Sequence, residues 1–308
     1  MLSIQRLRTF VEVARQGSFS KAARRLFLTQ PSVSRQVASL ERELKTPLIR
    51  RTPRGLVLTD AGRLLVDRSD GILAEMSALE RELSSLCGAE APPLRLGSFA
   101  SANVLLVPEA LRAFLCACPA SRVAVVSSSP ERHLEALASG DVDAAIVADW
   151  DVGHRDEWPE LELAPLIEDE LLLALPAAHA CAHRRRIRLR DFSETSWIEG
   201  AHPDCLGPIE TVFQELGAEP RIEYFCDEWL GKQAMIAAGL GAALLPALGL
   251  TGTLEGIVLR SLDGDVPRRR LYVAWRADES DESPARTLAE ILRATAHKQR
   301  PYCATASP

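Results

Sequence analysis

The hydrophobic pattern of this chain changes at residues 92 and 93, and the change limits the folds open to it. Before that point, apolar residues recur at spacings of three and four, which indicates amphipathic helices. After Pro92 and Pro93, short β-like runs alternate with helical segments, a rhythm typical of a mostly parallel sheet covered by helices on both faces. A length of 308 residues suits two or three domains. We therefore expect a mainly helical N-terminal part followed by a larger α/β part.

This rhythm predicts the following division of the chain. A small helical domain occupies residues 1–59, a long helix 60–88, a hinge 89–93, an α/β domain 94–300 and a tail 301–308. The α/β domain divides into two lobes, with residues 94–166 and 268–300 in lobe I and residues 167–267 in lobe II. Strands are expected at 94–98, 122–127, 143–148, 170–175, 196–199, 221–225, 241–245 and 271–275, and helices at 104–116, 130–139, 207–216, 232–238 and 285–297.

Charge is distributed unevenly between these parts. The whole chain has a formal charge of −6, yet residues 1–68 hold 14 Lys and Arg against 5 Asp and Glu, a balance of +9. The remaining residues therefore carry −15. A basic module on an acidic body is what a protein needs when only one of its parts faces a polyanion such as DNA.

The basic module reads as a helix–turn–helix followed by a wing. Gly17 is suited to end the first helix, and Thr29 to cap the third. The third helix places Gln30, Ser32, Ser34, Arg35 and Gln36 opposite its apolar stripe, and short polar side chains on a first helical turn suit a reader of the major groove. A basic turn with Arg50, Arg51 and Arg54 then leads into a short strand, as in a winged helix that grips the DNA backbone.

Residues 7–62 resemble the LysR-type transcriptional regulators along their whole length. The matching stretches are FVEVARQGSFSKAARRL at 10–26, TQPSVSRQVASLERELKTPLIRR at 29–51 and LTDAG at 58–62. Two departures are Lys45, where the family usually has glycine, and Ile49, where it usually has phenylalanine; Lys45 puts a left-handed helix cap in doubt. The expected DNA contacts are Ser18, Gln30, Pro31, Ser32, Ser34, Arg35, Arg50, Arg51, Arg54 and Thr59.

The long helix carries an apolar seam with alternating spacings of four and three. Such a heptad pattern predicts a coiled-coil contact between two subunits, although packing on the helix's own domain would produce a similar stripe. The family resemblance favours a dimer that sets two DNA-reading heads apart on half-sites about one helical turn apart, or a multiple of it. The expected dimerisation residues are Leu65, Ile72, Met76, Leu79, Leu83 and Leu86.

The α/β part resembles the effector-binding domain of the same family, which is similar to periplasmic solute-binding proteins. That resemblance implies a small-molecule effector held between the two lobes at the carboxyl ends of the strands. Hydroxyl groups in the expected site, with few aromatic residues, favour a polar or anionic effector. The expected contacts are Ser98, Ala100, Ser101, Asn103, Ser127, Ser128, Ser129, Gly200, Ala201, His202 and Asp227.

Other residues of the chain point towards functions that differ from this one. Cys205, with Cys226 as a possible partner, leaves open a thiol-based redox sensor of the same fold. His179, Cys181 and His183 could suggest a metal site, but three arginines follow directly and would repel a cation. A free solute-binding protein would need an export signal and no basic head, and the N-terminus shows the opposite of both. No spacing of Ser, His and Asp residues indicates an enzyme.

The sequence therefore predicts a regulator of the LysR type without cofactor, metal or catalytic residues. Its expected partners are double-stranded DNA with a partly palindromic operator, a small-molecule effector, RNA polymerase and further copies of itself in a homodimer or homotetramer. The longest apolar run, residues 234–250, is interrupted by glycines and a proline and is at the lower length limit for a membrane span. Seven cysteines without zinc-like pairing argue against a disulfide framework, and we expect a cytoplasmic protein with no membrane contact.

Overall fold

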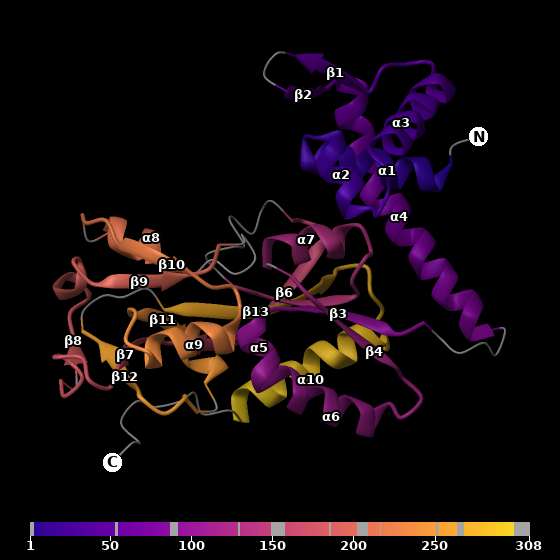
Figure 1. The fold of residues 1–308 in the computed structure, drawn as a ribbon. Helices are drawn as coiled ribbons and strands as arrows, with labels where there is room; N and C mark the ends of the chain where they lie inside the picture. The colour runs from indigo at the N-terminus through magenta and orange to yellow at the C-terminus, as the bar shows by residue number, and fades with distance from the viewer. Residues whose placement is uncertain are drawn as a thin grey trace. The chain divides into compact units, whose positions relative to one another are not determined.

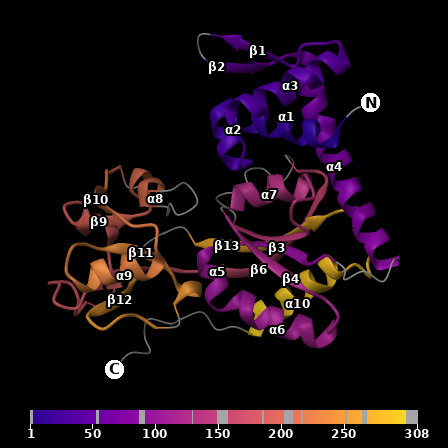
Figure 2. The ribbon, with the colours of Figure 1, turned by 45° about the vertical axis from the view of Figure 1, so that its right-hand side comes forward.

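The structure is a computed structural model, and its parts are shown in Figures 1 and 2. It describes residues 3–52, 55–86, 92–128, 130–148, 158–184, 186–201, 209–215, 217–250, 252–263 and 268–298. The chain forms two compact units, the first made mainly of Met1–Ala91 and the second of nearly all the rest.

The first unit is a three-helix domain with a two-stranded wing and a long helix. Its elements are α1 (Ile4–Gln16), α2 (Phe19–Arg25), α3 (Gln30–Leu44), β1 (Ile49–Thr52), β2 (Gly55–Leu58) and α4 (Asp60–Leu86). Strands β1 and β2 pair antiparallel, with Ile49 opposite Leu58. The core is built from the apolar stripes of the three short helices, with Phe10, Val33 and Leu40 fully buried. The predicted winged helix–turn–helix is therefore present.

Local signals mark where these helices begin and end. Gly17 ends α1 in the left-handed conformation, with φ of 57°. The hydroxyl oxygen of Ser18, an expected DNA contact, accepts a hydrogen bond from the backbone of Lys21 at 3.4 Å and caps α2. Thr29 lies at the N-cap of α3 with extended backbone, but its side chain makes no capping bond. Lys45 adopts the left-handed cap despite its side chain, with φ of 53°, so our doubt about this cap was wrong.

Lobe I of the second unit is a five-stranded sheet in the order β4-β3-β5-β13-β6. The strands are β3 (Leu94–Ser98), β4 (Val123–Ser127), β5 (Ala144–Ala148), β6 (Leu161–Asp169) and β13 (Arg269–Arg276). In β5, Ala144, Ile146 and Ala148 pack on the side of α6 (Leu106–Ala117) and α10 (Pro284–Lys298), whereas Ala145 and Val147 pack on the side of α7 (Pro130–Ala138). Both faces of the sheet are thus covered, which explains the unbroken apolar run in β5.

Lobe II is built in the same layered way around a four-stranded sheet in the order β11-β7-β12-β8. Its strands are β7 (Leu171–Pro176), β8 (Arg186–Ile187), β11 (Ala243–Pro246) and β12 (Ile257–Leu262), and β9 (Ser196–Glu199) pairs separately with β10 (Arg221–Phe225). Leu173 and Leu175 pack on the side of α8 (Ile209–Glu215), and Leu172 and Ala174 on the side of α9 (Trp229–Ala237).

Three predictions about the second unit need correction. The expected helix at 104–116 corresponds to α6, which begins at Leu106, and a separate short helix α5 (Ala100–Val104) precedes it. Strands β6, β8 and β12 were not predicted, and β6 continues to Asp169, beyond the expected end of lobe I at residue 166. The sheets are also mixed rather than mostly parallel. Strand β13 runs antiparallel to both β5 and β6, and β7 antiparallel to both β11 and β12, because the chain crosses twice between the lobes.

Candidate nucleic-acid interface and ligand region

Helix α3 separates its apolar and polar residues cleanly. Val33, Val37 and Leu40 are buried in the core, while Gln30, Pro31 and Arg35 are exposed on the first two turns. Ser32 and Ser34 are half-buried. The side chain of Gln36 is bonded to α1, because the Thr9 hydroxyl donates to its Oε1 at 2.7 Å. The first unit thus offers a polar, cationic strip at the beginning of α3.

The wing is attached to α3 by a carboxylate. Glu41 Oε1 accepts hydrogen bonds from the backbone of Leu48 at 2.8 Å and of Ile49 at 3.1 Å, which fixes the start of β1. Arg50 in β1 is exposed and therefore free to face a polyanion. Arg51 also lies in β1, and Arg54 lies outside the described residues. The described part of the wing thus places at least one basic side chain on the surface.

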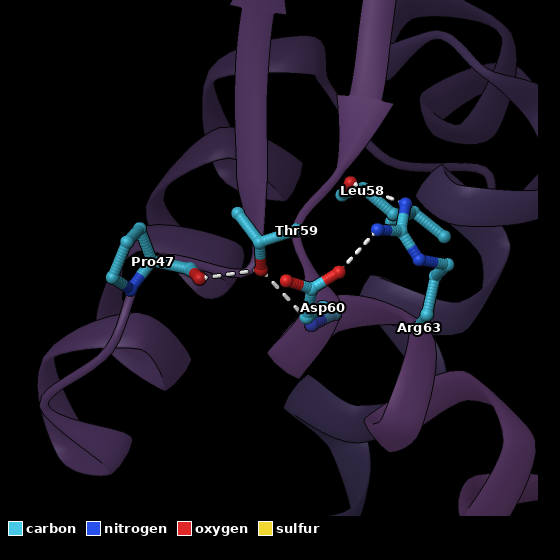
Figure 3. Close-up of polar contacts among 6 residues, drawn as sticks. Pro47, Leu58, Thr59, Asp60 and Arg63 are labelled. Carbon is cyan, nitrogen blue, oxygen red and sulfur yellow. Dashed lines mark hydrogen bonds and ion pairs between the residues drawn. The ribbon is translucent and has the colours of Figure 1, made fainter.

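Thr59 does not lie on that surface, contrary to our expectation of a DNA contact. Its side chain is buried, donates to the Pro47 carbonyl at 2.7 Å and accepts from the Gly62 backbone at 3.0 Å (Figure 3). The second of these bonds caps α4, because it satisfies an amide that has no partner within the helix. Arg63 donates to the Leu58 carbonyl at 3.0 Å and pairs with Asp60 beside it.

The structure explains why the LTDAG stretch ends in a glycine, Gly62. A Cβ atom at this position would lie 2.1 Å from the Leu48 carbonyl oxygen, which is closer than any real contact. Only glycine lets α4 begin this close to the strand that starts the wing. The stretch is therefore structural: it anchors α4 to the winged domain, through the Thr59 cap and the missing Gly62 side chain.

The predicted dimerisation residues of α4 divide into two groups. Leu65 is half-buried and packs against the core of the winged domain, as the alternative interpretation expects. Farther along the helix, Ile72, Leu79 and Leu83 are 49%, 48% and 51% exposed, and Met76 is half-buried. The side chain of Leu86 is not among those described. The exposed members keep the heptad spacing, so α4 carries an apolar stripe over its second half.

In lobe I, the expected effector contacts form a connected group at the ends of β3 and β4. The Ser128 amide donates to the Ser98 carbonyl at 3.1 Å, and Asn103 Nδ2 donates to Ser127 Oγ at 3.0 Å. Ser98 and Ser101 are buried, whereas Ala100 and Ser127 are exposed. Ser129 lies outside the described residues. The structure therefore brings these residues together but keeps two of their hydroxyl groups inside the fold.

In lobe II, two of the expected contacts are joined directly. The Ala201 amide donates to Asp227 Oδ1 at 2.7 Å, and both residues are exposed. Gly200 is buried beside a buried ion pair, in which Lys232 Nζ lies 3.2 Å from Glu199 Oε1 and the same oxygen accepts from the Gly200 amide. His202 lies outside the described residues. Lys232 and Glu199 neutralise each other here and were not expected from the sequence.

A second buried ion pair lies where the chain crosses between the lobes. Asp169 ends β6, Arg269 begins β13, and the two residues are paired in register and bonded through their side chains. Asp169 also accepts from the Leu248 amide of lobe II at 2.8 Å. Arg269 donates to Ser101 Oγ of lobe I at 2.9 Å, with its guanidinium carbon 5.1 Å from the centre of the Phe99 ring. We call Phe99, Ser101, Asp169, Leu248 and Arg269 the crossover cluster.

Close packing completes the crossover cluster. A Cβ atom at Gly249 would lie 2.9 Å from Trp229 Cζ2 and 3.0 Å from Ser101 Cβ, so the absence of a side chain there lets residues of the two lobes meet. Sequence reasoning missed Asp169, Trp229 and Arg269. Arg269 is one of three consecutive arginines, and only the strand register shows which of them points inward.

Neither a metal site nor a disulfide is formed by the described residues. They contain no group of three or more His, Cys, Asp and Glu side chains that could hold a metal ion. His179 Nδ1 instead accepts from the Cys181 amide at 3.1 Å, and its ring stacks on Phe192. Cys226 is a half-buried free thiol, and Cys205 lies outside the described residues. Within the same described part, no helix is long and apolar enough to cross a lipid bilayer.

Comparison with known proteins matches both units to one family. Residues 4–63 match the family described as bacterial regulatory helix-turn-helix protein, lysR family, and residues 88–297 match the LysR substrate binding domain. The chain is 27% identical over 281 residues to the Hca operon transcriptional activator HcaR of Escherichia coli K12, covering 90% of this chain and 93% of that protein. It is 28% identical over 296 residues to the transcriptional dual regulator OxyR of the same organism, covering 95% of both.

A solved structure has the same fold over nearly the whole chain. The regulator CbnR, solved in complex with its target DNA, has a TM-score of 0.57 and 21% identity, with 96% of this chain and 100% of that chain covered. At this identity the likeness concerns the fold alone.

Proposed function

This chain belongs to the LysR family of bacterial transcriptional regulators, and from that premise we propose that it binds a partly palindromic DNA operator as a homodimer or homotetramer. It works by binding rather than by catalysis, in the cytoplasm, where it meets both DNA and RNA polymerase. Gln30, Pro31, Ser32, Ser34 and Arg35 contact base edges and nearby phosphates, and Ser18, Arg50, Arg51 and Arg54 contact the DNA backbone.

The observation that carries this proposal is the division of α3 into a buried apolar face and an exposed polar beginning. Exposed Gln30 and Arg35 side chains can reach base edges and phosphates, while the buried valines hold the helix on its domain. CbnR, which has the same fold, has been solved with its target DNA. The exposed Ile72, Leu79 and Leu83 of α4 supply an apolar surface for a second copy of the chain.

We also propose that a small polar or anionic effector acts at the crossover cluster and the neighbouring hydroxyl groups. Because Arg269 can only donate, the Ser101 oxygen accepts its hydrogen bond, and the Ser101 proton remains available as a donor. A hydrogen-bond acceptor on the effector, such as a carboxylate oxygen, fits that donor. Ser101 is only 4% exposed, so an effector that uses it must displace part of the packing around it. Such displacement would couple effector binding to the arrangement of the lobes.

The proposal is tested by fluorescence anisotropy with the DNA immediately upstream of the protein's own gene. We expect saturable binding that is stronger than binding to random DNA of the same length. Arg35→Ala should weaken operator binding by about 1–3 kcal/mol if Arg35 contacts a base, because a good bidentate base contact is worth that much. An unchanged affinity of the Arg35→Ala protein at physiological salt would refute this role, and equal binding to operator and random DNA would place the operator elsewhere.

A further inference from the structure

Phe27 combines two unfavourable features that the fold does not require. Its side chain is 95% exposed, the largest value among the large apolar side chains that the structure describes. Its φ of 53° also places the backbone in the left-handed region, which bulky residues rarely adopt. An exposed aromatic ring gains nothing from burial, and a left-handed backbone costs conformational free energy. When strain of this kind persists, function is the first explanation to examine.

The turn at Phe27 is made by the backbone alone. The Phe27 amide donates to the Arg24 carbonyl at 3.3 Å and the Leu28 amide to the Ala23 carbonyl at 2.9 Å, the two bonds of a Schellman motif. Glycine is the usual residue at the left-handed position of this motif. The neighbours Leu26 and Leu28 pack against the core, while Phe27 does not. A glycine or an asparagine could therefore form the same turn with less strain.

The surroundings of Phe27 indicate what its ring contacts. Lys21, Arg24 and Arg25 on α2 are exposed before it, and Thr29, Gln30 and Pro31 are exposed after it, at the beginning of α3. Arg25 also pairs with Glu12, whereas Lys21 and Arg24 form no ion pair with any of the described residues. The ring thus lies in an exposed, basic stretch that continues into the first turn of α3. A partner for this stretch must combine negative charge with apolar patches.

We propose that Phe27 is a DNA-contacting residue, whose ring packs against a deoxyribose or a thymine methyl group at the edge of the groove that α3 enters. DNA carries phosphates next to apolar sugar faces and methyl groups, which matches a phenyl ring flanked by cations. The inference rests on the proposed function, in which α3 reads DNA. Because the ring neutralises no phosphate, it adds affinity without adding to the salt dependence of binding.

The test compares Phe27→Gly and Phe27→Leu with the wild-type full-length protein. The DNA probe is the duplex that the wild-type protein enriches from a random-sequence pool, and binding is measured by anisotropy at several salt concentrations. We expect Phe27→Gly to raise the thermal unfolding midpoint, because the strain is relieved, and yet to weaken operator binding about tenfold, as loss of one good contact would. The slope of log affinity against log salt should stay unchanged, and Phe27→Leu should keep most of the affinity.

Two control variants separate this contact from other effects. Ile4→Ala removes another exposed apolar side chain of the same unit, 37% exposed on α1, and should leave DNA affinity unchanged. Arg24→Ala should instead reduce the salt slope by about one, as expected for a lost phosphate contact. A Phe27→Gly protein that binds the operator as well as wild type overturns the proposal, and Phe27 then faces a protein partner.

The failure of the proposal can be distinguished from that of the proposed function. If the wild-type protein enriches no sequence from the pool, α3 does not read DNA and both inferences fall together. If it enriches a sequence that Phe27→Gly binds equally well, only the role of Phe27 is refuted. A Phe27→Gly protein with a lower unfolding midpoint would also overturn the proposal, because the ring would then stabilise the fold.

Discussion

Lys45 occupies a backbone conformation in which the family usually has glycine. Its amide donates to the Arg42 carbonyl and the following Thr46 amide to the Glu41 carbonyl, so the Schellman motif forms in full. The lysine side chain is exposed and its absence would remove no packing. The departure from the family's glycine put this cap in doubt, but the two hydrogen bonds at the end of α3 form with lysine in that position.

Lys45→Gly should therefore stabilise the first unit. Relief of the left-handed conformation at a non-glycine residue is worth about 1 kcal/mol in the free energy of unfolding. The free energy of unfolding is measured in urea on the full-length protein, from the transition in which the first unit unfolds. Lys45→Ala is the control, because alanine keeps the Cβ strain and should give no such gain. Equal stabilisation by both variants would show that loss of the lysine charge, and not relief of strain, is responsible.

At the scale of elements, the two halves of α4 differ in what their apolar residues contact. Its beginning is fixed to the winged domain by the Thr59 cap, the close approach at Gly62 and the packing of Leu65. Its second half exposes Ile72, Leu79 and Leu83. Packing on the helix's own domain thus accounts for the beginning of the stripe, and dimerisation stays a prediction for its second half.

A double substitution on α4 tests the predicted dimerisation through the second half of the helix. Leu79→Glu with Leu83→Glu should shift the protein towards monomers in sedimentation velocity, because like charges cannot be buried between two helices. Operator affinity should fall as the monomer fraction rises, since two winged domains can no longer bind their half-sites together. Glu75→Gln, an exposed change on the same helix, should leave the sedimentation coefficient unchanged. An unchanged oligomer in the double variant would mean that the subunits associate through another surface.

The crossover cluster is the second element-scale feature with a measurable consequence. Asp169 and Arg269 are 1% and 7% exposed, so removal of either partner leaves a buried charge without its counterion. Asp169→Asn alone and Arg269→Gln alone should each destabilise the second unit by about 3–5 kcal/mol. The double variant should lose much less than the sum, because no charge is then left unpaired. Strictly additive losses in urea unfolding would show that the two side chains do not interact.

At the scale of the whole molecule, the division of charge separates DNA binding from the rest of the protein. Only charges that neutralise phosphates release counterions, so the salt dependence of operator binding should come from the basic first 68 residues. Arg50→Ala should lower the slope of log affinity against log salt by about one for each lost phosphate contact. Glu290→Gln, an exposed change on α10, should leave the slope unchanged. A slope insensitive to Arg50 would place the wing away from the backbone.

Local signals along the chain were sufficient to predict much of the fold. The periodicity of 3.6 and the cap positions Gly17 and Thr29 marked helices of the first unit, and the alternation after Pro93 marked β3, β4 and β10 within a residue or two. These signals are local because helix periodicity and capping involve residues that are near one another in sequence. The polar beginning of α3 was predictable for the same reason.

Features that depend on partners distant in sequence were visible only in the tertiary structure. The burial of Thr59 depends on Pro47, and the role of Arg269 on Asp169 and Ser101, which are 100 and 168 residues away in the chain. The missed strands β6, β8 and β12 are also defined by their neighbours in the sheets. The sequence alone therefore determined the family, the main helices and the polar beginning of α3, because local pattern specifies them. The crossover cluster was decided by the tertiary structure, because chain crossing and strand register place a side chain inside or outside.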